Sequence, residues 1–303
     1  MLRPSNRSNR VAQRSDVGKD NPTIDIDVNN VQIGTMKMNH KFNADGAGPL
    51  LVHPERPESR FRPLKALHHF RELIKDKEDT EQVFHIFECL PRRNFRKEAL
   101  AFSTSEKGAA IRGQEAFLPE ILDDHDRLRA MPEGSLAHAY CEFMEKEGLS
   151  AAGLVAEFDK FHSRKYGDLI EWYGDRQRDT HDLLHVLTGY GRDALGEQCV
   201  LAFTYGQSPA PAHLFIAYLG GLNMKKMVKS DAPVFKAISQ ARKMGRNCPR
   251  ITEESILEML EQPLDELRQK MNIKTPTAYL EAHRAYRSDG IDPYDLLGDL
   301  AAA

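Results

Sequence analysis

The stretch RDTHDLLHVLTGYGRDALGEQC, residues 178–199, predicts two helices joined by a tight bend. Gly189 and Gly191 flank Tyr190 and can supply left-handed backbone, so the first helix should end at these residues. Asp193 suits the N-cap position of the helix that follows. The expected structure is therefore an antiparallel helical hairpin.

The polar side chains of this hairpin have the spacing of a metal site. His181 and His185 are i and i+4, on one face of the first helix, and Asp182 can reach the same side. Two histidines with this spacing also bind the metal of HExxH sites. His185 precedes the bend by about one turn and Glu197 follows it by about one turn, so the two side chains should face each other. Two imidazoles and two carboxylates suit a divalent ion, with zinc our first expectation and iron, cobalt or manganese as alternatives.

Other interpretations of these residues remain open at this point. The four side chains could be chance polar residues on a solvated helix face. Asp179 could orient one of the histidines or cap the helix N-terminus. Metal phosphohydrolases of the HD type also use an adjacent His-Asp pair, with further ligands from distant helices, and His162 could be such a ligand. The His-Asp pair in DDHDRLR, residues 123–129, lacks a second histidine at helical spacing and is interpreted as solvated surface.

Length and composition indicate a protein with a sizeable core in a reducing compartment. The chain has 303 residues, and its net charge of −3 does not favour nucleic-acid binding. It contains no apolar run of about 18 residues, so no transmembrane helix is expected. The four cysteines form no CxxC pair, which argues against a cysteine-built zinc site. Cys199, two residues after Glu197, is interpreted as a small buried apolar residue.

The chain should form one all-α domain between two less regular ends. Residues 1–60 are a polar extension in which TIDIDVNNVQIGTMKM, residues 23–38, has the alternation of a small hairpin. The N-terminal sequence MLRPSNRSNRVAQR is rich in arginine, like an organelle presequence, but it lacks an apolar face, so we expect a disordered tail. Residues 61–290 have helical spacing and residues 291–303 are a C-terminal tail.

The first predicted helix begins after Pro63, a residue that suits a first helical turn. Further helices are predicted at 79–89, 119–129, 135–147, 150–162, 177–188, 193–206, 212–229, 233–244, 252–271 and 276–286. No strand is expected after residue 60.

Two further stretches suggest what surrounds the site. Segment 212–228, AHLFIAYLGGLNMKKMV, carries Gly220 and Gly221, which permit a close approach either of a neighbouring helix or of an isoprenoid tail. Residues 225–250 contain eight lysines and arginines against one acid, Asp231. This stretch is predicted to hold the protein to an anionic membrane surface, and ordinary solvated helix faces are the alternative.

HDLLH, eleven residues and then Glu197 resemble the HDxxH-x11-E signature of the coenzyme Q biosynthesis protein 4 family. The resemblance spans about residues 60–285. It extends to the stretches RQRDTHDLLHVLTGYG and GRDALGEQ around the bend and to MPEGSLAHAY at residues 131–140. The first sixty residues depart from it. The resemblance implies an all-helical fold with His181, Asp182, His185 and Glu197 as metal ligands and as the catalytic residues.

The resemblance implies a function in ubiquinone biosynthesis. The family is associated with oxidative decarboxylation at ring carbon C1 of a polyprenylated hydroxybenzoate-type precursor and with organising a biosynthetic complex. A Lewis-acidic metal with an open coordination position would serve this lyase reaction, although zinc would need a separate oxidant for any hydroxylation. A non-enzymatic scaffold that presents lipid intermediates is the alternative.

The expected partners follow from this interpretation. They are a polyprenylated aromatic lipid, other ubiquinone-biosynthesis proteins, a membrane surface bound peripherally and a second copy of the chain, without nucleic acid. We expect the protein in the bacterial cytoplasm at the inner membrane, or on the matrix side of the mitochondrial inner membrane if it is eukaryotic.

Overall fold

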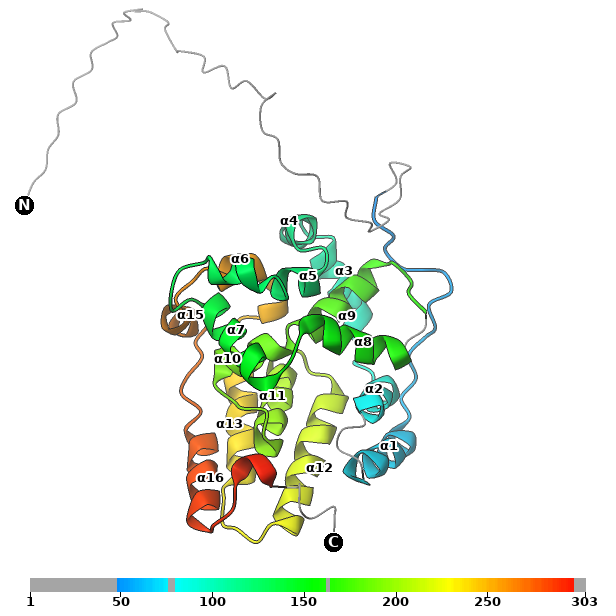
Figure 1. Cartoon of the computed structure of the whole chain (residues 1–303). Coiled ribbons are helices and arrows are strands. Elements are labelled where there is room, and N and C mark those ends of the chain that lie inside the picture. The colour runs from blue at the N-terminus through cyan, green and yellow to red at the C-terminus, as the bar shows by residue number, and fades with distance from the viewer. Residues whose placement is uncertain (1–47, 76–79, 162–163, 297–303) are drawn as a thin grey trace, which may run out of the picture. The chain divides into compact units, whose positions relative to one another are not determined.

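The computed structural model describes residues 48–75, 80–161 and 164–296, and these residues form helices without a strand (Figure 1). One isolated bridge joins Ser135 to Pro263. The prediction of an all-α fold is thus confirmed for the described part of the chain. The predicted hairpin at residues 23–38 and the predicted N-terminal tail lie outside the described residues.

The longer helices are α1 (Pro63–Lys75), α2 (Thr80–Cys89), α3 (Phe95–Ser103), α4 (Glu106–Gln114), α7 (Leu136–Glu147), α8 (Ala151–Phe161), α9 (Leu169–Asp179), α10 (His181–Thr188), α11 (Ala194–Gln207), α12 (Pro211–Met227), α13 (Val234–Asn247) and α16 (Thr277–Ser288). Shorter elements are α5 (Leu118–Leu122), α6 (His125–Arg129), η1 (Ile251–Glu253), α14 (Ile256–Leu260), α15 (Leu264–Lys270) and η2 (Pro293–Asp295). None of these described helices is long and apolar enough to cross a membrane.

Three predicted helices are interrupted, and side chains that bond to the backbone explain the interruptions. The helix predicted at 119–129 stops at Asp123, whose carboxylate accepts hydrogen bonds from the first turn of α8. The helix predicted at 252–271 is divided twice, at Ser255, which caps α14, and at Pro263, which precedes α15 and has no backbone N–H. The helix predicted at 177–188 is divided at Thr180, whose hydroxyl donates to the carbonyls of the preceding turn. Such local side-chain bonds compete with a continuous helix.

Helix α11 lies at the centre of the main core, with α12 and α13 beside it and α16 next to α13 (Figure 1). Cys199 and Phe203 on α11 are fully buried, as was expected of the cysteine. Glycines bring α11 and α13 together, because a Cβ added at Gly245 would lie 2.0 Å from the carbonyl oxygen of Phe203. Backbone contact at this point therefore requires a residue without a side chain.

Gly220 and Gly221 of α12 also allow a close approach, and the neighbours are protein side chains. A Cβ added at Gly221 would lie 2.8 Å from Ile238 of α13, and one at Gly220 would lie 2.7 Å from Gln198 of α11. The interpretation as helix packing is therefore correct at these two glycines, and the space is not left for an isoprenoid tail.

A buried ion pair ties α9 to the segment that leads into α14. The Arg176 guanidinium lies 2.7 Å from the Glu115 carboxylate, and both side chains are buried. Arg176 also donates to the carbonyls of Thr252 and Glu254, while Glu115 accepts from the hydroxyl of Ser255. Because these hydrogen bonds satisfy both charges, the pair is well compensated, and removing one partner alone would leave a buried charge.

The contact between α11 and α13 yields a stability prediction. Gly245→Ala should lower the free energy of unfolding by about 1–3 kcal/mol, because the new methyl group has to displace backbone. Gly113→Ala is the matched control, since Gly113 lies on α4 with no atom within 4 Å of an added Cβ, and there alanine should be neutral or stabilise by up to about 1 kcal/mol. Urea unfolding of both variants measures the difference. Equal midpoints for the two variants would contradict the close helix contact.

Candidate metal centre

The hairpin of α10 and α11 forms where the sequence predicted it. Gly189 ends α10 with φ of 74°, and its N–H donates to the carbonyl of His185. The Asp193 carboxylate caps α11 by accepting from Leu195 N and Gly196 N, each at 3.1 Å. Both expectations are confirmed, and together they fix the direction in which the two helices leave the bend.

Gly191 has a different role from the one expected. Its φ is not in the left-handed region, unlike that of Gly189. A Cβ added at Gly191 would lie 2.8 Å from the hydroxyl oxygen of Tyr294 and 2.9 Å from that of Tyr279. Gly191 is therefore required for the close approach of two tyrosines, not for its backbone conformation.

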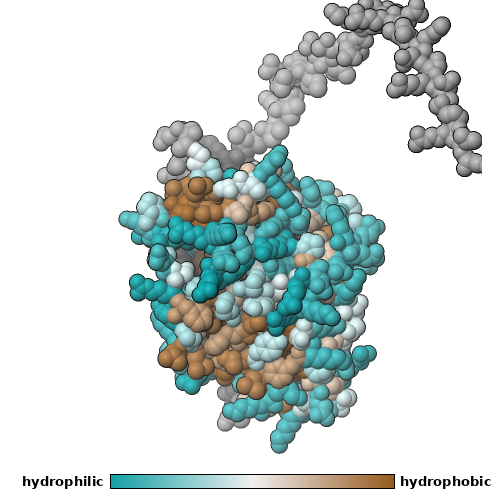
Figure 2. Space-filling view, turned by 180° about the vertical axis from the view of Figure 1, so that it is seen from behind, coloured by the Kyte–Doolittle hydropathy of each residue, from teal (hydrophilic) through white to brown (hydrophobic). Residues whose placement is uncertain are grey.

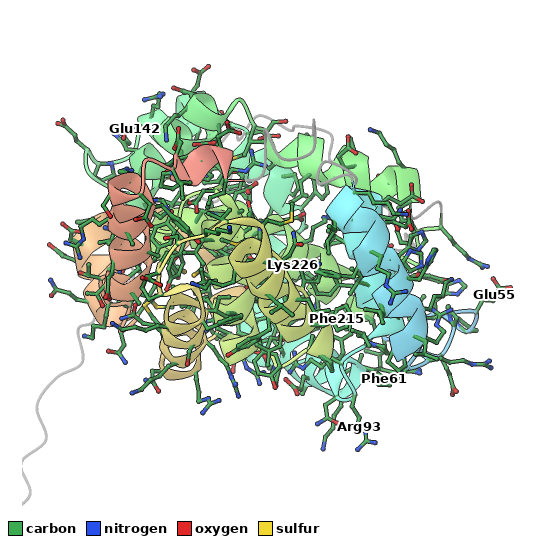
Figure 3. All side chains as sticks on the ribbon, turned by 90° about the horizontal axis from the view of Figure 1, so that it is seen from below. Glu55, Phe61, Arg93, Glu142, Phe215 and Lys226 are labelled. Carbon is green, nitrogen blue, oxygen red and sulfur yellow. The ribbon has the colours of Figure 1, made fainter. Side chains whose placement is uncertain are left out.

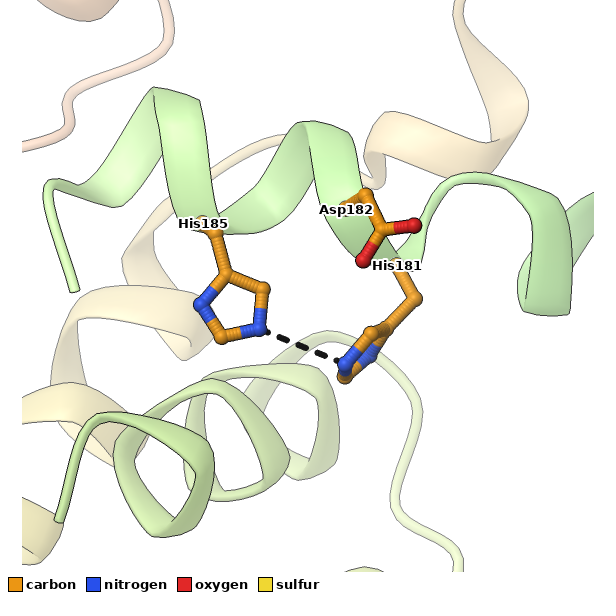
Figure 4. A group of neighbouring side chains, drawn as sticks. All are labelled: His181, Asp182 and His185. Atoms are coloured by element: carbon orange, nitrogen blue, oxygen red, sulfur yellow. Dashed lines mark hydrogen bonds between the residues drawn. The ribbon is translucent and has the colours of Figure 1, made fainter. Parts of the chain in front are cut away.

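His181, Asp182 and His185 form a compact group on α10 (Figure 4). One ligand atom from each of the three lies within 4.8 Å of those of the other two. The Nε2 atoms of the two histidines are 3.3 Å apart. Nitrogen and oxygen atoms gathered in this way can bind one ion between them.

Glu197 reaches the same group from the other helix of the hairpin. Its Oε2 lies 3.4 Å from Nε2 of His181, and its Oε1 lies 3.5 Å from Nε2 of His185. The first turn of α11 thus faces both imidazoles. Three of the four residues singled out in the sequence, His181, Asp182 and His185, thus form one group, and Glu197 faces its two imidazoles from the other helix.

His185 is held in one orientation and one tautomer. Its Nδ1 lies 3.1 Å from the carbonyl oxygen of Tyr190, and a carbonyl can only accept, so Nδ1 carries the proton. The ring stacks on Phe143 with 5.6 Å between ring centroids, and the side chain has no exposed surface. In the neutral ring Nε2 is therefore the nitrogen with the free lone pair, and it points toward His181 and Glu197. Metal-binding histidines are commonly oriented by a carbonyl in this way.

Charge interactions keep Glu197 ionised and His181 basic. Burial raises the pKa of the Glu197 carboxyl, but the charge of His185 and hydrogen bonds from both imidazoles outweigh it and hold this pKa well below its usual range. Burial lowers the pKa of His181. The hydrogen bond to Glu197 and the charge of Glu197 raise this pKa by more than burial lowers it, so the net shift is upward. The side chains of His181 and Glu197 are each 30% exposed, which leaves one side of the group accessible to solvent.

Asp179 takes neither of the two roles considered for it. It is the last residue of α9, and its buried carboxylate accepts from the guanidinium of Arg178 at 2.8 Å. Burial raises the pKa of Asp179 to about 7, and Arg178 opposes this shift. The N-cap of α10 is Thr180. Asp179 is therefore the ion-pair partner of Arg178. The break at Thr180 puts Asp179 on α9, whereas the two histidines are on α10.

The other His-Asp pair, the partly exposed His125 and the exposed Asp126 at the start of α6, lies on the solvated surface, as the sequence indicated. Asp124 caps α6, and His125 lies 3.3 Å from the exposed carboxylate of Glu145. His162, the candidate for an additional ligand in the HD-type interpretation, lies outside the described residues.

His213, in the first turn of α12, is a neighbour of the group that sequence reasoning missed. Loss of hydration and the charge of His181 lower the pKa of His213 to about 3, so the imidazole is neutral at physiological pH. Its Nδ1 is buried without a hydrogen-bond partner in the described part of the chain. No spacing rule connects it to the hairpin, because the loop between α11 and α12 brings it there.

Comparison with known proteins places the chain among relatives of one kind. A family model described as "Coenzyme Q (ubiquinone) biosynthesis protein Coq4" matches residues 101–277. The mitochondrial ubiquinone biosynthesis protein COQ4 homolog of Bos taurus is 26% identical over 203 residues, which are 66% of this chain and 74% of that protein. The human homolog, also named as mitochondrial, is 24% identical over 243 residues, 80% of this chain and 89% of that protein.

A solved structure has the same fold. The crystal structure of a candidate ubiquinone biosynthesis protein from Nostoc punctiforme superposes with a TM-score of 0.51 and 18% sequence identity, and the match covers 71% of this chain and 100% of the other. This likeness concerns the fold alone. Because the family model matches more than half of the sequence, the chain belongs to the family of the coenzyme Q (ubiquinone) biosynthesis protein Coq4.

Proposed function

We propose that this protein performs a metal-dependent step of ubiquinone biosynthesis, the oxidative decarboxylation at ring carbon C1 of a polyprenylated hydroxybenzoate-type precursor. In this step the carboxyl group leaves as CO2, a hydroxyl oxygen from water takes its place on the ring, and dioxygen is the external oxidant that accepts the two electrons. The observation that carries the proposal is the convergence of His181, His185 and Glu197 from two helices, with the two Nε2 atoms 3.3 Å apart. Membership of the family supports the pathway. The reaction and the roles of the residues are our proposal.

The donor set fits a divalent metal ion. His181, Asp182, His185 and Glu197 would hold it, through two imidazole nitrogens and two carboxylates, a mixture that suits zinc first and also iron, cobalt or manganese. A bound ion would supply a Lewis acid for the carboxylate or a phenolic oxygen of the substrate. The partial exposure of His181 and Glu197 leaves an approach for such a group.

The remaining residues prepare the site by position and charge. The Tyr190 carbonyl and the Phe143 ring keep Nε2 of His185 aimed at the centre. The Asp193 cap fixes the first turn of α11 and thereby Glu197. His213 stays neutral, so it adds no positive charge beside His181. These contacts reduce the reorganisation that binding a metal and a substrate would otherwise require.

The polyprenyl tail needs apolar surroundings close to this centre. A second hydrophobic cluster lies between α1, α2 and α12, and it includes Phe70, Ile86 and Ile216. His213 touches this region, because its ring packs edge-on against Phe87 with 4.7 Å between centroids. We propose that the tail lies against the partly exposed side chains on this cluster, such as Phe215 and Leu219, because the charge of His181 acts on His213 beside it.

The metal assignment makes the first functional prediction. Purified protein should contain about one divalent metal ion per chain, and His181→Ala should lose most of it while remaining folded. His125→Ala is the control, because His125 lies beside Glu145 and outside the group, and it should keep the metal. Elemental analysis and circular dichroism measure the two properties. Full metal occupancy in the His181→Ala variant would disprove the assignment.

A second prediction separates an enzyme from a scaffold. Glu197→Gln keeps the size of the side chain but removes the charge that faces both imidazoles. If the group acts chemically, a deletion strain carrying this variant should accumulate precursor that retains the ring carboxyl, while the variant still binds its biosynthetic partners. Lipid extracts and a pull-down from the same cells provide the measurement. Normal ubiquinone, with metal and partners retained, would leave only the organising role.

The basic stretch at residues 225–250 is divided by its contacts. Arg250 pairs with Glu98, and Lys236 pairs with Glu281, so acids from other helices neutralise part of the charge. Only part of this stretch therefore carries uncompensated positive charge. Figure 2 shows apolar areas between hydrophilic ones on one face of the molecule.

We propose that the C-terminal end of α12 contacts an anionic membrane surface. Lys225, Lys226 and Lys229 are exposed there, beside the exposed apolar residues Leu222 and Met227. Figure 3 labels Lys226 on α12. Cations next to apolar side chains are the usual composition of a peripheral membrane contact. Binding to other ubiquinone-biosynthesis proteins and to a second copy of the chain stays a prediction.

Charge reversal tests the membrane contact. The triple variant Lys225→Glu, Lys226→Glu and Lys229→Glu should bind anionic vesicles more weakly than the wild type, and added salt should weaken wild-type binding, because screening acts over a Debye length of about 8–10 Å. The control reverses three exposed cations around the start of α3, listed here as Arg93, Arg96 and Lys97. Vesicle co-sedimentation with equal loss in both triple variants would show that only net charge matters.

A further inference from the structure

A cleft of about 610 Å³ lies behind the hairpin, between α7, α15, α16 and the bend. His185 forms part of its wall, although the Nε2 atom of that ring is directed to the metal-binding group. Helix α16 begins at Thr277, the last residue that the family model matches. The cleft is therefore completed by a segment that follows the matched part of the chain, and none of the roles assigned above uses it.

The cleft is basic. Its charged lining consists of four cations (Lys146, Arg268, Arg284 and Arg287) and one acid, Glu147. Lys146 lies 3.2 Å from Glu147, and Arg268 donates to the last carbonyls of α10, so both have partners. Arg284 and Arg287 are one turn apart on α16 and are exposed, with no ion pair to either among the described residues. Two guanidinium groups are thus available to an anion.

The walls of the cleft are aromatic. Phe143, Tyr190, Tyr279 and Tyr294 line it, and His283 lies with its ring 4.2 Å from that of Tyr279. Binding sites for small molecules generally have volumes of about 300–1,000 Å³, with mainly apolar and aromatic walls and a few polar groups. The volume and composition of the cleft lie within this range.

A buried network makes the floor of the cleft rigid. The Asp193 side chain has no exposed surface, and its Oδ1 lies 3.1 Å from Nε2 of His283. The Tyr279 hydroxyl donates to the same carboxylate and accepts from the N–H of Gly191 at 3.0 Å. The rings of Tyr279 and His283 are consequently fixed, so the cleft exists before a ligand arrives.

We propose that this cleft binds a small aromatic anion, an aryl phosphate or aryl carboxylate. Arg284 and Arg287 hold the anionic group, and the tyrosine rings hold the aromatic body. This second site does not require the metal, and it stands independently of the decarboxylase proposal.

Calorimetry on the full metal-loaded chain tests the site with phenyl phosphate and benzoate as probes. Inorganic phosphate supplies the anion alone, and phenol supplies the ring alone. At least one aromatic anion should bind with one molecule per chain, at least about tenfold more tightly than inorganic phosphate or phenol, because both parts of the cleft contribute. No binding of either aromatic anion, or equal binding of inorganic phosphate, would overturn the proposal.

Three variants locate the bound probe. Arg284→Gln with Arg287→Gln should weaken binding at least about tenfold, whereas Lys243→Gln with Arg246→Gln removes the same charge from exposed positions on α13 and should leave binding unchanged. Tyr294→Leu should weaken phenyl phosphate more than inorganic phosphate. Equal effects of the two double variants would contradict the assignment to α16.

The metal-binding group is the other place where a phosphate could bind. His181→Ala, which should lack the metal, is therefore titrated with the same probes and should bind them as the wild type does. Binding that is lost in His181→Ala but kept in the arginine double variant would place the probe on the metal and disprove the second site. Metal content of the arginine variant, unchanged from wild type, shows that the hairpin is intact.

Discussion

The hairpin depends on the hydrogen bonds that the buried carboxylate of Asp193 accepts. It accepts from two backbone N–H groups at the start of α11 and from the Tyr279 hydroxyl, and it lies 3.1 Å from His283. A charge without exposed surface is tolerated only when such donors surround it. Because all of these partners are fixed, the direction of α11 is fixed, and so is the position of Glu197.

The two sides of the bend have different chemistry, and Tyr190 links them. The carbonyl of Tyr190 accepts a hydrogen bond from Nδ1 of His185 and so orients Nε2 toward the metal-binding group. Tyr190 also lines the basic cleft on the other side of the bend. A ligand in that cleft would touch the same segment that orients His185. The metal-binding group and the cleft therefore share the bend and the end of α10, although α7, α15 and α16 supply the rest of the cleft.

The surrounding helices make this piece rigid. Helix α11 contacts α13 backbone to backbone at Gly245, and the buried pair of Arg176 and Glu115 joins α9 to the segment before α14. Close packing of this kind has low compressibility, so the backbone of the central helix is held in place. Metal and substrate sites depend on such support, because small displacements of the ligands weaken binding.

The sequence by itself determined the features that depend on neighbouring residues. The i and i+4 spacing of His181 and His185, the end of the helix at Gly189 and the N-cap at Asp193 follow from helical periodicity and local backbone preferences, and the structure has all of them. Tertiary structure alone decided the rest. Tyr279 reaches Asp193 across 86 residues, and His213 arrives beside His181 from another helix. Such contacts depend on how whole helices pack, and no local pattern records that packing.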